Sequence, residues 1–112
     1  KVVADFNEAI HELNDFTYYR NNKFKPLLPD NEIKAKIQVP NEKLKKCQET
    51  INKISPTNNE NSNNLNNLRQ QIAEALAQSE THLQFVNTYL TKSSLIRKTM
   101  FSKISWMGIP LN

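Results

Sequence analysis

SNNLNNLRQQIAEALAQSETHLQFVNTYLT, residues 62–91, decides the fold of this chain. Its large aliphatic residues recur every three or four positions along most of its length: Leu65, Leu68, Ile72, Leu76, Leu83, Val86 and Leu90. This spacing gives an α-helix one apolar face, and the helix would be roughly 43 Å long. The narrow stripe of the first half suits a two-helix, coiled-coil seam. Phe85 and Tyr89 widen the second half, which we expect other helices to surround.

Three further helices are predicted around this one. A helix over 2–20 follows from the spacing of Val3, Phe6, Ile10 and Leu13, and a helix over 41–55 from that of Leu44, Cys47, Ile51 and Ile54. A last helix is predicted over 94–107. Gly108 follows it at the position where a left-handed residue commonly ends a helix, and Pro110 stands two residues later.

The segment 21–40 is predicted to connect the first two helices. Its residues 32–39 alternate apolar with polar side chains, which is typical of a strand. Ile33 and Ile37 are also four residues apart, as in a helix that Asp30 could cap. Because the sequence offers no second strand for pairing, we favour a short helix or an irregular segment.

Together these elements predict an all-α fold, an antiparallel bundle of about four helices in one domain spanning 1–112. The helix over 62–91 is longer than its neighbours. Either the helices over 41–55 and 94–107 share it end to end, or a second copy of the chain covers the overhang in a homodimer. The sequence leaves these alternatives open.

Composition narrows the functional classes. One glycine among 112 residues argues against phosphate-cradling loops and tight β-turns. The single cysteine precludes an intrachain disulfide and favours a reducing compartment such as the cytoplasm. No apolar run approaches the roughly 20 residues of a membrane span. The chain begins at Lys1, so we expect a fragment or a processed product. Its many asparagines look like compositional bias and receive no functional weight.

Charge is unevenly distributed along the chain, whose net charge is +4. Asp5, Glu8, Glu12 and Asp15 form an acidic row on the outer face of the first predicted helix. This row could lie against Lys43, Lys46 and Lys53, or against a basic partner. Residues 91–112 contain basic residues and no acidic ones, so this block keeps its positive charge.

Candidate chemistry is sparse. Glu8 and His11 have the Glu-x-x-His spacing of a di-iron site, but His82 has no glutamate three residues before it. Cys47 lies in an apolar row and is interpreted as a small buried hydrophobe. No hydrolase, redox, metalloprotease or phosphate-binding motif occurs. We therefore predict no enzymatic activity, no metal and no cofactor.

Binding is the remaining class of function. The stretch 16–25 interleaves aromatic and basic residues, as nucleic-acid sites do. No known nucleic-acid-binding signature accompanies it, so we do not expect that partner. Residues 95–109 are basic and apolar around most of the helical circumference. This breadth favours burial on two sides, one against the bundle and one against a partner chain, and packing into the chain's own core alone stays open as an alternative. The candidate partner-binding residues are Trp106, Phe101, Met107, Leu95, Tyr18 and Tyr19.

The sequence thus predicts a non-enzymatic protein-interaction module. Such a module could be a small adaptor, a chaperone-like subunit or an inhibitor that binds and regulates another protein through helix surfaces. The alternative is a peripheral domain that binds anionic membranes through a basic helix containing tryptophan. The residues for that alternative are Arg97, Lys98, Lys103 and Trp106.

Overall fold

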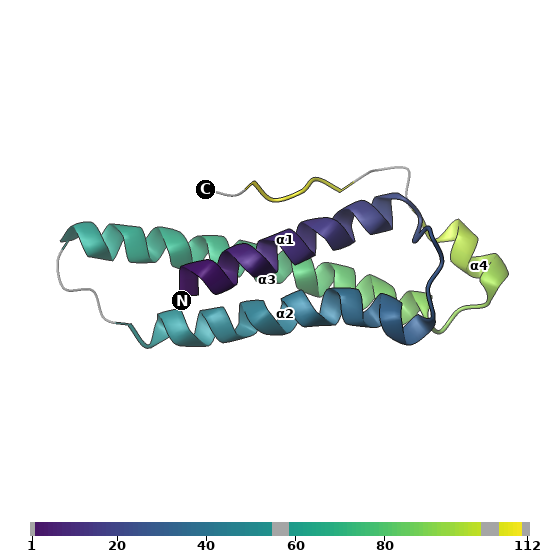
Figure 1. Cartoon of the computed structure of the whole chain (residues 1–112), viewed down its shortest axis with the longest axis horizontal. Helices are drawn as coiled ribbons and strands as arrows, with labels where there is room; N and C mark the ends of the chain where they lie inside the picture. The colour runs from purple at the N-terminus through teal and green to yellow at the C-terminus, as the bar shows by residue number, and fades with distance from the viewer. Residues whose placement is uncertain (1, 55–58, 102–105, 111–112) are drawn as a thin grey trace.

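Three long helices lie side by side in the computed structural model, which describes residues 2–54, 59–101 and 106–110 (Figure 1). They are α1 (Val2–Asn21), α2 (Asp30–Asn52) and α3 (Asn59–Tyr89), and a short α4 (Ser94–Thr99) follows. Successive long helices run antiparallel (Figure 1). The described residues contain no strand, so the prediction of an all-α bundle with one long helix is confirmed.

α1 matches its predicted range closely and buries the predicted row, including Phe6, Ile10 and Leu13. It ends where Lys23 and Phe24 adopt left-handed backbone angles, with φ of 61° and 56°. Each such angle costs on the order of 1 kcal/mol for a residue other than glycine. Burial of Phe24 offsets this cost, since removing such a ring from water contributes about 2–3 kcal/mol. Rings from α1, α3 and the segment after α4 surround it: Phe16, Tyr19, Phe85, Tyr89 and Phe101.

α2 begins at Asp30 rather than at residue 41, so the expected connector over 21–40 is wrong for its second half. The helix starts directly after Pro29, whose carbonyl accepts hydrogen bonds from the amides of Glu32 and Ile33. One buried row continues through the whole helix: Ile33, Ile37, Pro40, Leu44, Cys47 and Ile51. Pro40 removes one backbone donor, but its ring lies in this row. Burial of the row therefore outweighs the proline, and residues 30–39 are helical.

α3 (Asn59–Tyr89) lies close to its predicted range and packs along α2. Its most buried row is Ile72, Ala75, Ser79, His82, Val86 and Tyr89. The leucines that we expected to be central flank this row and are half-buried. Asn41 of α2 bridges the helices, donating hydrogen bonds to Ser79 Oγ at 2.9 Å and Glu80 Oε2 at 2.8 Å. Because α2 accompanies α3 for most of its length (Figure 1), α2 itself covers most of the length that we expected two helices placed end to end to share. The homodimer stays a prediction.

The predicted helix over 94–107 is wrong for the described residues 100–101 and 106–107, which are not helical, and its residues 102–105 lie outside the described residues. α4 starts at the Ser93 cap and ends after six residues. Arg97 fixes it: the guanidinium donates to the carbonyls of Tyr89 and Leu90 at the end of α3, and it pairs with Asp30 at 3.2 Å. Phe101 then turns into the aromatic cluster around Phe24, so the chain leaves the helix to bury this ring.

Residues 106–110 are extended and run antiparallel to α1 (Figure 1). Gly108 therefore does not end a helix, and that expectation is also corrected. A Cβ atom on Gly108 would lie 3.3 Å from Asn14 Oδ1. Because it has no side chain, the glycine allows the segment to approach α1 closely. This role differs from the helix-ending role that we predicted.

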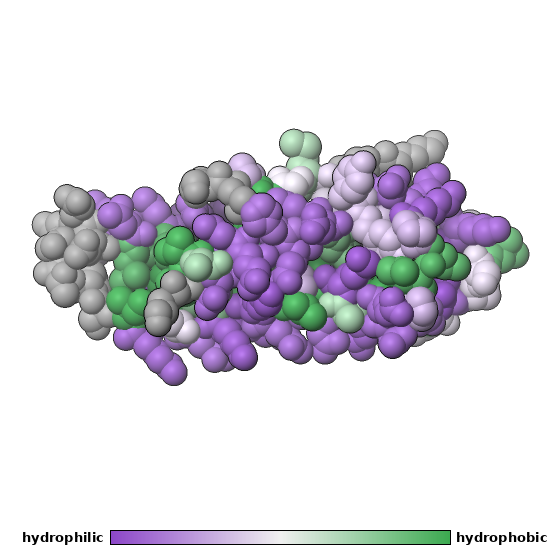
Figure 2. Space-filling view, viewed as in Figure 1, coloured by the Kyte–Doolittle hydropathy of each residue, from purple (hydrophilic) through white to green (hydrophobic). Residues whose placement is uncertain are grey.

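The middle of the face in Figure 2 is largely hydrophilic, and apolar side chains gather towards the two ends of the bundle. Exposed apolar residues near the α4 end include Leu27, Leu95 and Ile96. Among the residues that the structure describes, no helix has the length and apolar content needed to cross a membrane.

Candidate binding groove

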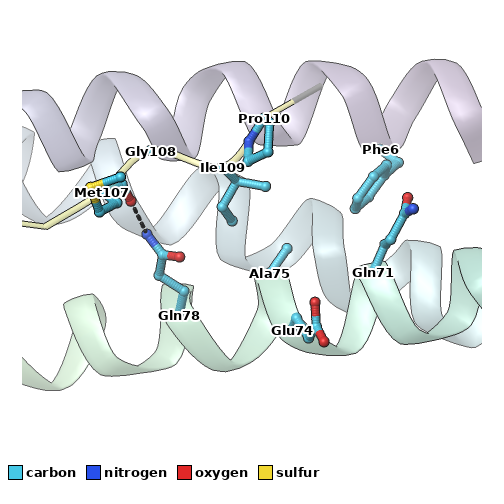
Figure 3. Close-up of a pocket in the computed structure, with 9 residues that line it drawn as sticks. All are labelled: Phe6, Gln71, Glu74, Ala75, Gln78, Met107, Gly108, Ile109 and Pro110. Atoms are coloured by element: carbon cyan, nitrogen blue, oxygen red, sulfur yellow. Dashed lines mark hydrogen bonds between the residues drawn. The ribbon is translucent and has the colours of Figure 1, made fainter. Parts of the chain in front are cut away.

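A groove separates α1 from α3. Each of these helices packs extensively on α2, but they meet one another only sparsely. Residues 106–110, here called the C-terminal segment, lie in this groove with α1 on one side and α3 on the other (Figure 3). The bundle therefore holds an extended piece of polypeptide where a fourth long helix would otherwise pack.

Asn14 of α1 holds the main chain of the C-terminal segment at Ile109. Its Nδ2 donates to the carbonyl of Ile109 at 2.7 Å, and its Oδ1 accepts from the amide of Ile109 at 2.6 Å. One side-chain amide thus satisfies both polar groups of one residue, as a neighbouring strand would.

Asn21 repeats this arrangement at Trp106. Its Nδ2 donates to the carbonyl of Trp106 at 2.8 Å, and its Oδ1 accepts from the amide of Trp106 at 3.0 Å. From the opposite wall, Gln78 Nε2 of α3 donates to the carbonyl of Met107 at 3.4 Å (Figure 3). Both helices therefore contact the main chain of the segment, and these contacts require no particular side chain from it.

The Trp106 ring lies on a polar cluster built by α1 and α3. Its centroid is 4.8 Å from the ring of His82 and 4.9 Å from the guanidinium carbon of Arg20. The same guanidinium carbon lies 3.8 Å from the Phe85 centroid. The guanidinium of Arg20 therefore contacts two aromatic rings at cation–π distance, while burial lowers the pKa of Arg20.

His82 is buried and its hydrogen bonds fix its tautomer. Arg20 Nη1 can only donate, so His82 Nδ1 accepts this bond at 3.0 Å. Nε2 then carries the proton and donates to Thr17 Oγ1 at 3.1 Å. Burial, reinforced by the nearby Arg20 charge, lowers the pKa of His82 to about 4. With both ring nitrogens engaged and Thr17 buried, neutral His82 forms a polar support beneath Trp106 together with Arg20 and Thr17.

A cavity of about 370 Å³ remains beside the other end of the segment. Phe6 of α1 and Ala75 of α3 line it together with Ile109, whose side chain points towards Ala75 (Figure 3). Pro110 is exposed, and Met107 is 82 % exposed. The segment thus leaves room for a larger apolar side chain at the position of Ile109.

The candidate partner-binding residues divide into two groups. Tyr19 and Phe101 belong to the aromatic cluster around Phe24, and Trp106 is half-buried on His82. Exposed residues form the second group: Tyr18 at 74 %, Leu95 at 75 % and Met107 at 82 %. The predicted set is therefore not one surface. Its interaction role stays a prediction for the exposed members.

The residues of the membrane alternative are also separated. Arg97 is engaged with Asp30 and with backbone carbonyls, and Trp106 lies in the groove. Lys98 is exposed on α4. Lys103 falls outside the described residues. Arg97 and Lys98 therefore lie on the short α4 and Trp106 does not, so these three residues do not share the single amphipathic helix that the alternative assumed.

The acidic row of α1 partly meets α2, as the sequence suggested. Lys43 pairs with Glu8 at 3.0 Å and with Glu12 at 2.9 Å. The hydrogen bond that Lys43 donates to Glu12 raises the pKa of Lys43 most, followed by the bond that it donates to Glu8. Lys46 and Lys53 are exposed. The described residues contain no cluster of three histidine, cysteine or carboxylate side chains able to hold a metal ion.

Cys47 is buried, which confirms its interpretation as a small apolar residue. Burial raises the pKa of its thiol, and this keeps it protonated and a poor nucleophile.

Sequence reasoning overlooked Asn14, Asn21 and His82. A usable signal was present, because Asn7, Asn14 and Asn21 recur at intervals of seven and so share one face of α1. The abundance of asparagine elsewhere concealed this regularity. Comparison with models of known protein families, with curated proteins and with solved structures finds no match to this chain.

Proposed function

We propose that this chain is a non-enzymatic protein-interaction module that binds and regulates another protein, as a small adaptor, chaperone-like subunit or inhibitor does. The observation that carries the proposal is the pair of asparagine clamps in the α1–α3 groove. Asn14 and Asn21 each hold both main-chain polar groups of one extended residue. A surface with this chemistry is suited to bind polypeptide, since every peptide unit offers the same donor and acceptor.

The polar groups of the groove support binding rather than chemical conversion. His82 has no free lone pair, because Arg20 occupies Nδ1 and the Nε2 proton is directed at Thr17. The Cys47 thiol lies in the α2 row. A general base or nucleophile must reach a substrate atom, and neither of these groups is placed to do so.

Site-specific cross-linking tests this proposal. Tyr18 is exposed and lies one helical turn after Asn14, so a photo-reactive phenylalanine analogue there would report on molecules at the edge of the groove. The same analogue at Glu49, exposed on α2, is the matched control. We expect one protein from cells of the source organism to cross-link at Tyr18 and not at Glu49, and to be lost with Asn14→Leu plus Asn21→Leu. If neither position captures a protein, the proposed function is wrong.

The α4 end of the bundle favours membrane binding as a second candidate. Leu27 and Lys98 line a hollow of about 420 Å³ there, together with Lys23 and Lys25. Exposed leucines surrounded by lysines are the chemistry of an interfacial membrane contact. Co-sedimentation with phosphatidylserine vesicles tests this candidate. Binding that falls with salt and is lost with Leu95→Ala plus Lys98→Ala would support it, whereas no binding at low salt would dismiss it.

A further inference from the structure

The spacing of the asparagine clamps matches the repeat of an extended chain. Asn14 and Asn21 are seven residues apart on α1, a rise of about 10.5 Å. Trp106 and Ile109 are three residues apart in an extended segment, a span of about 10 Å. Every seventh residue of α1 therefore lies opposite every third residue of the bound chain. This agreement does not depend on the side chains of the bound segment.

The same geometry provides a third position. Asn7 lies seven residues before Asn14, on the same face of α1, and is half-buried. An extended ligand that continues three residues beyond the position of Ile109 would bring its main chain to Asn7. The helix thus carries three equally spaced amides on one face, of which Asn14 and Asn21 contact the described part of the C-terminal segment.

Four consecutive positions of the segment meet different surroundings. The first is aromatic and lies on His82 and Arg20. The second, Met107, points to solvent, and the third, Gly108, passes so close to Asn14 that a side chain there would press on its amide. The fourth, Ile109, enters the cavity without filling it.

We propose that the α1–α3 groove binds an extended segment of a partner protein, antiparallel to α1, with an aromatic, an unrestricted, a small and a large aliphatic residue in succession. The chain's own residues 106–110 are an intramolecular competitor for this site. This inference rests on the proposed interaction function and specifies its ligand. A longer, unbranched side chain such as methionine at the fourth position would reach further into the cavity than β-branched Ile109, so a partner segment carrying it can displace the C-terminal segment despite its tether.

A labelled peptide with the sequence of residues 104–112 tests the inference on the full-length chain. The chain carries Trp106→Ala and Ile109→Ser, so its own segment no longer competes well. We expect this freed chain to bind the peptide at least tenfold more tightly than the intact chain does. A peptide carrying Ile109→Met should bind more tightly still, because its longer side chain reaches further into the cavity, and a peptide of scrambled sequence should not bind.

The clamps are tested in the same freed chain. Asn14→Leu and Asn21→Leu keep the number and branching of side-chain heavy atoms but remove two hydrogen bonds each, and each should weaken peptide binding by about tenfold. Asn87→Leu is the control, because Asn87 is exposed on α3 and lies half a turn out of phase with Gln78. Circular dichroism of each variant establishes that the helices are retained.

Three outcomes would overturn the inference. The freed chain does not bind the peptide; binding is unchanged by both clamp substitutions; or the intact chain forms a concentration-dependent dimer that Asn14→Leu dissolves. The last result would make a second copy the occupant instead of a partner protein. Retained cross-linking at Tyr18 without peptide binding would leave the interaction function standing and remove only this ligand.

Discussion

The contact between α2 and α3 and the groove between α1 and α3 join helices in opposite ways. Along α2 and α3 the helices pack through buried apolar side chains of one core, among them Ile37, Leu44 and Ile72. In the groove, side-chain amides of α1 and Gln78 of α3 hold an extended main chain between the helices. The first contact is specific for this chain's own side chains, whereas the second relies on groups that any polypeptide possesses. Stability therefore resides mainly in the α2–α3 contact, and the proposed recognition of a partner in the groove.

The largest effect is expected from breaking the α2–α3 contact. Leu44→Ala removes a fully buried side chain and should lower the free energy of unfolding by about 3 kcal/mol. Leu95→Ala, at a side chain that is 75 % exposed, should change it by less than about 0.5 kcal/mol. Urea unfolding followed by circular dichroism measures both. Equal effects of the two substitutions would contradict the assignment of the core.

The polar cluster under Trp106 should make the fold sensitive to acid. The pKa of His82 falls from 6.5 to about 4 in the folded chain, so the unfolded chain binds the proton more readily between these values. The contribution of neutral His82 to the free energy of unfolding is fully present above about pH 7 and is lost as the pH falls from 6.5 to 4. This contribution amounts to about 3 kcal/mol.

The measurement is the free energy of unfolding from pH 7.5 to 4, compared with His82→Gln. Carboxylates titrate in both proteins, so the difference between the two curves isolates His82. The wild-type chain should lose more stability over this range than the variant does. Parallel curves would mean that His82 does not carry this dependence.

The fold class and two of the helix ranges were predictable because one apolar face at helical spacing determines them. α1 and α3 lie near their expected bounds for this reason. The start of α2 was missed because proline is normally excluded from helix interiors. Here Pro40 continues the buried row from Ile37 to Leu44 and is retained.

The groove was harder to predict, because its partners are far apart in sequence. Ile109 pairs with Asn14, and Trp106 with Asn21. Residues 94–107 carry helical apolar spacing, but the aromatic cluster draws Phe101 inward and the asparagines offer an alternative set of hydrogen bonds. Helix propensity depends on residues that are close in sequence, so it takes account of neither the aromatic cluster nor the hydrogen bonds from the asparagines. Only the interval of seven among Asn7, Asn14 and Asn21 was visible in the sequence.

A smaller effect is expected from removing one clamp in the otherwise intact chain. Asn14→Leu eliminates two hydrogen bonds to Ile109 and should weaken the seating of the segment by about 1–2 kcal/mol. Trp106 is the only tryptophan, so its emission reports on this seating and should shift to longer wavelength. Asn87→Leu should leave the emission unchanged. An unaltered spectrum in Asn14→Leu would mean that the clamp does not hold the segment.

The smallest effect is expected at Gly108. A methyl group there would lie 3.3 Å from Asn14 Oδ1 and 3.4 Å from its Cγ, so the amide must shift by a few tenths of an ångström. Gly108→Ala also restricts the unseated chain, which favours seating and offsets part of the loss. We expect the hydrogen-exchange protection of the Ile109 amide to fall by less than about fivefold, corresponding to under about 1 kcal/mol. Met107→Ala, at an exposed side chain, should leave that protection unchanged. A larger loss in Met107→Ala than in Gly108→Ala would show that side chains, rather than the approach of main chain to Asn14, hold the segment in the groove.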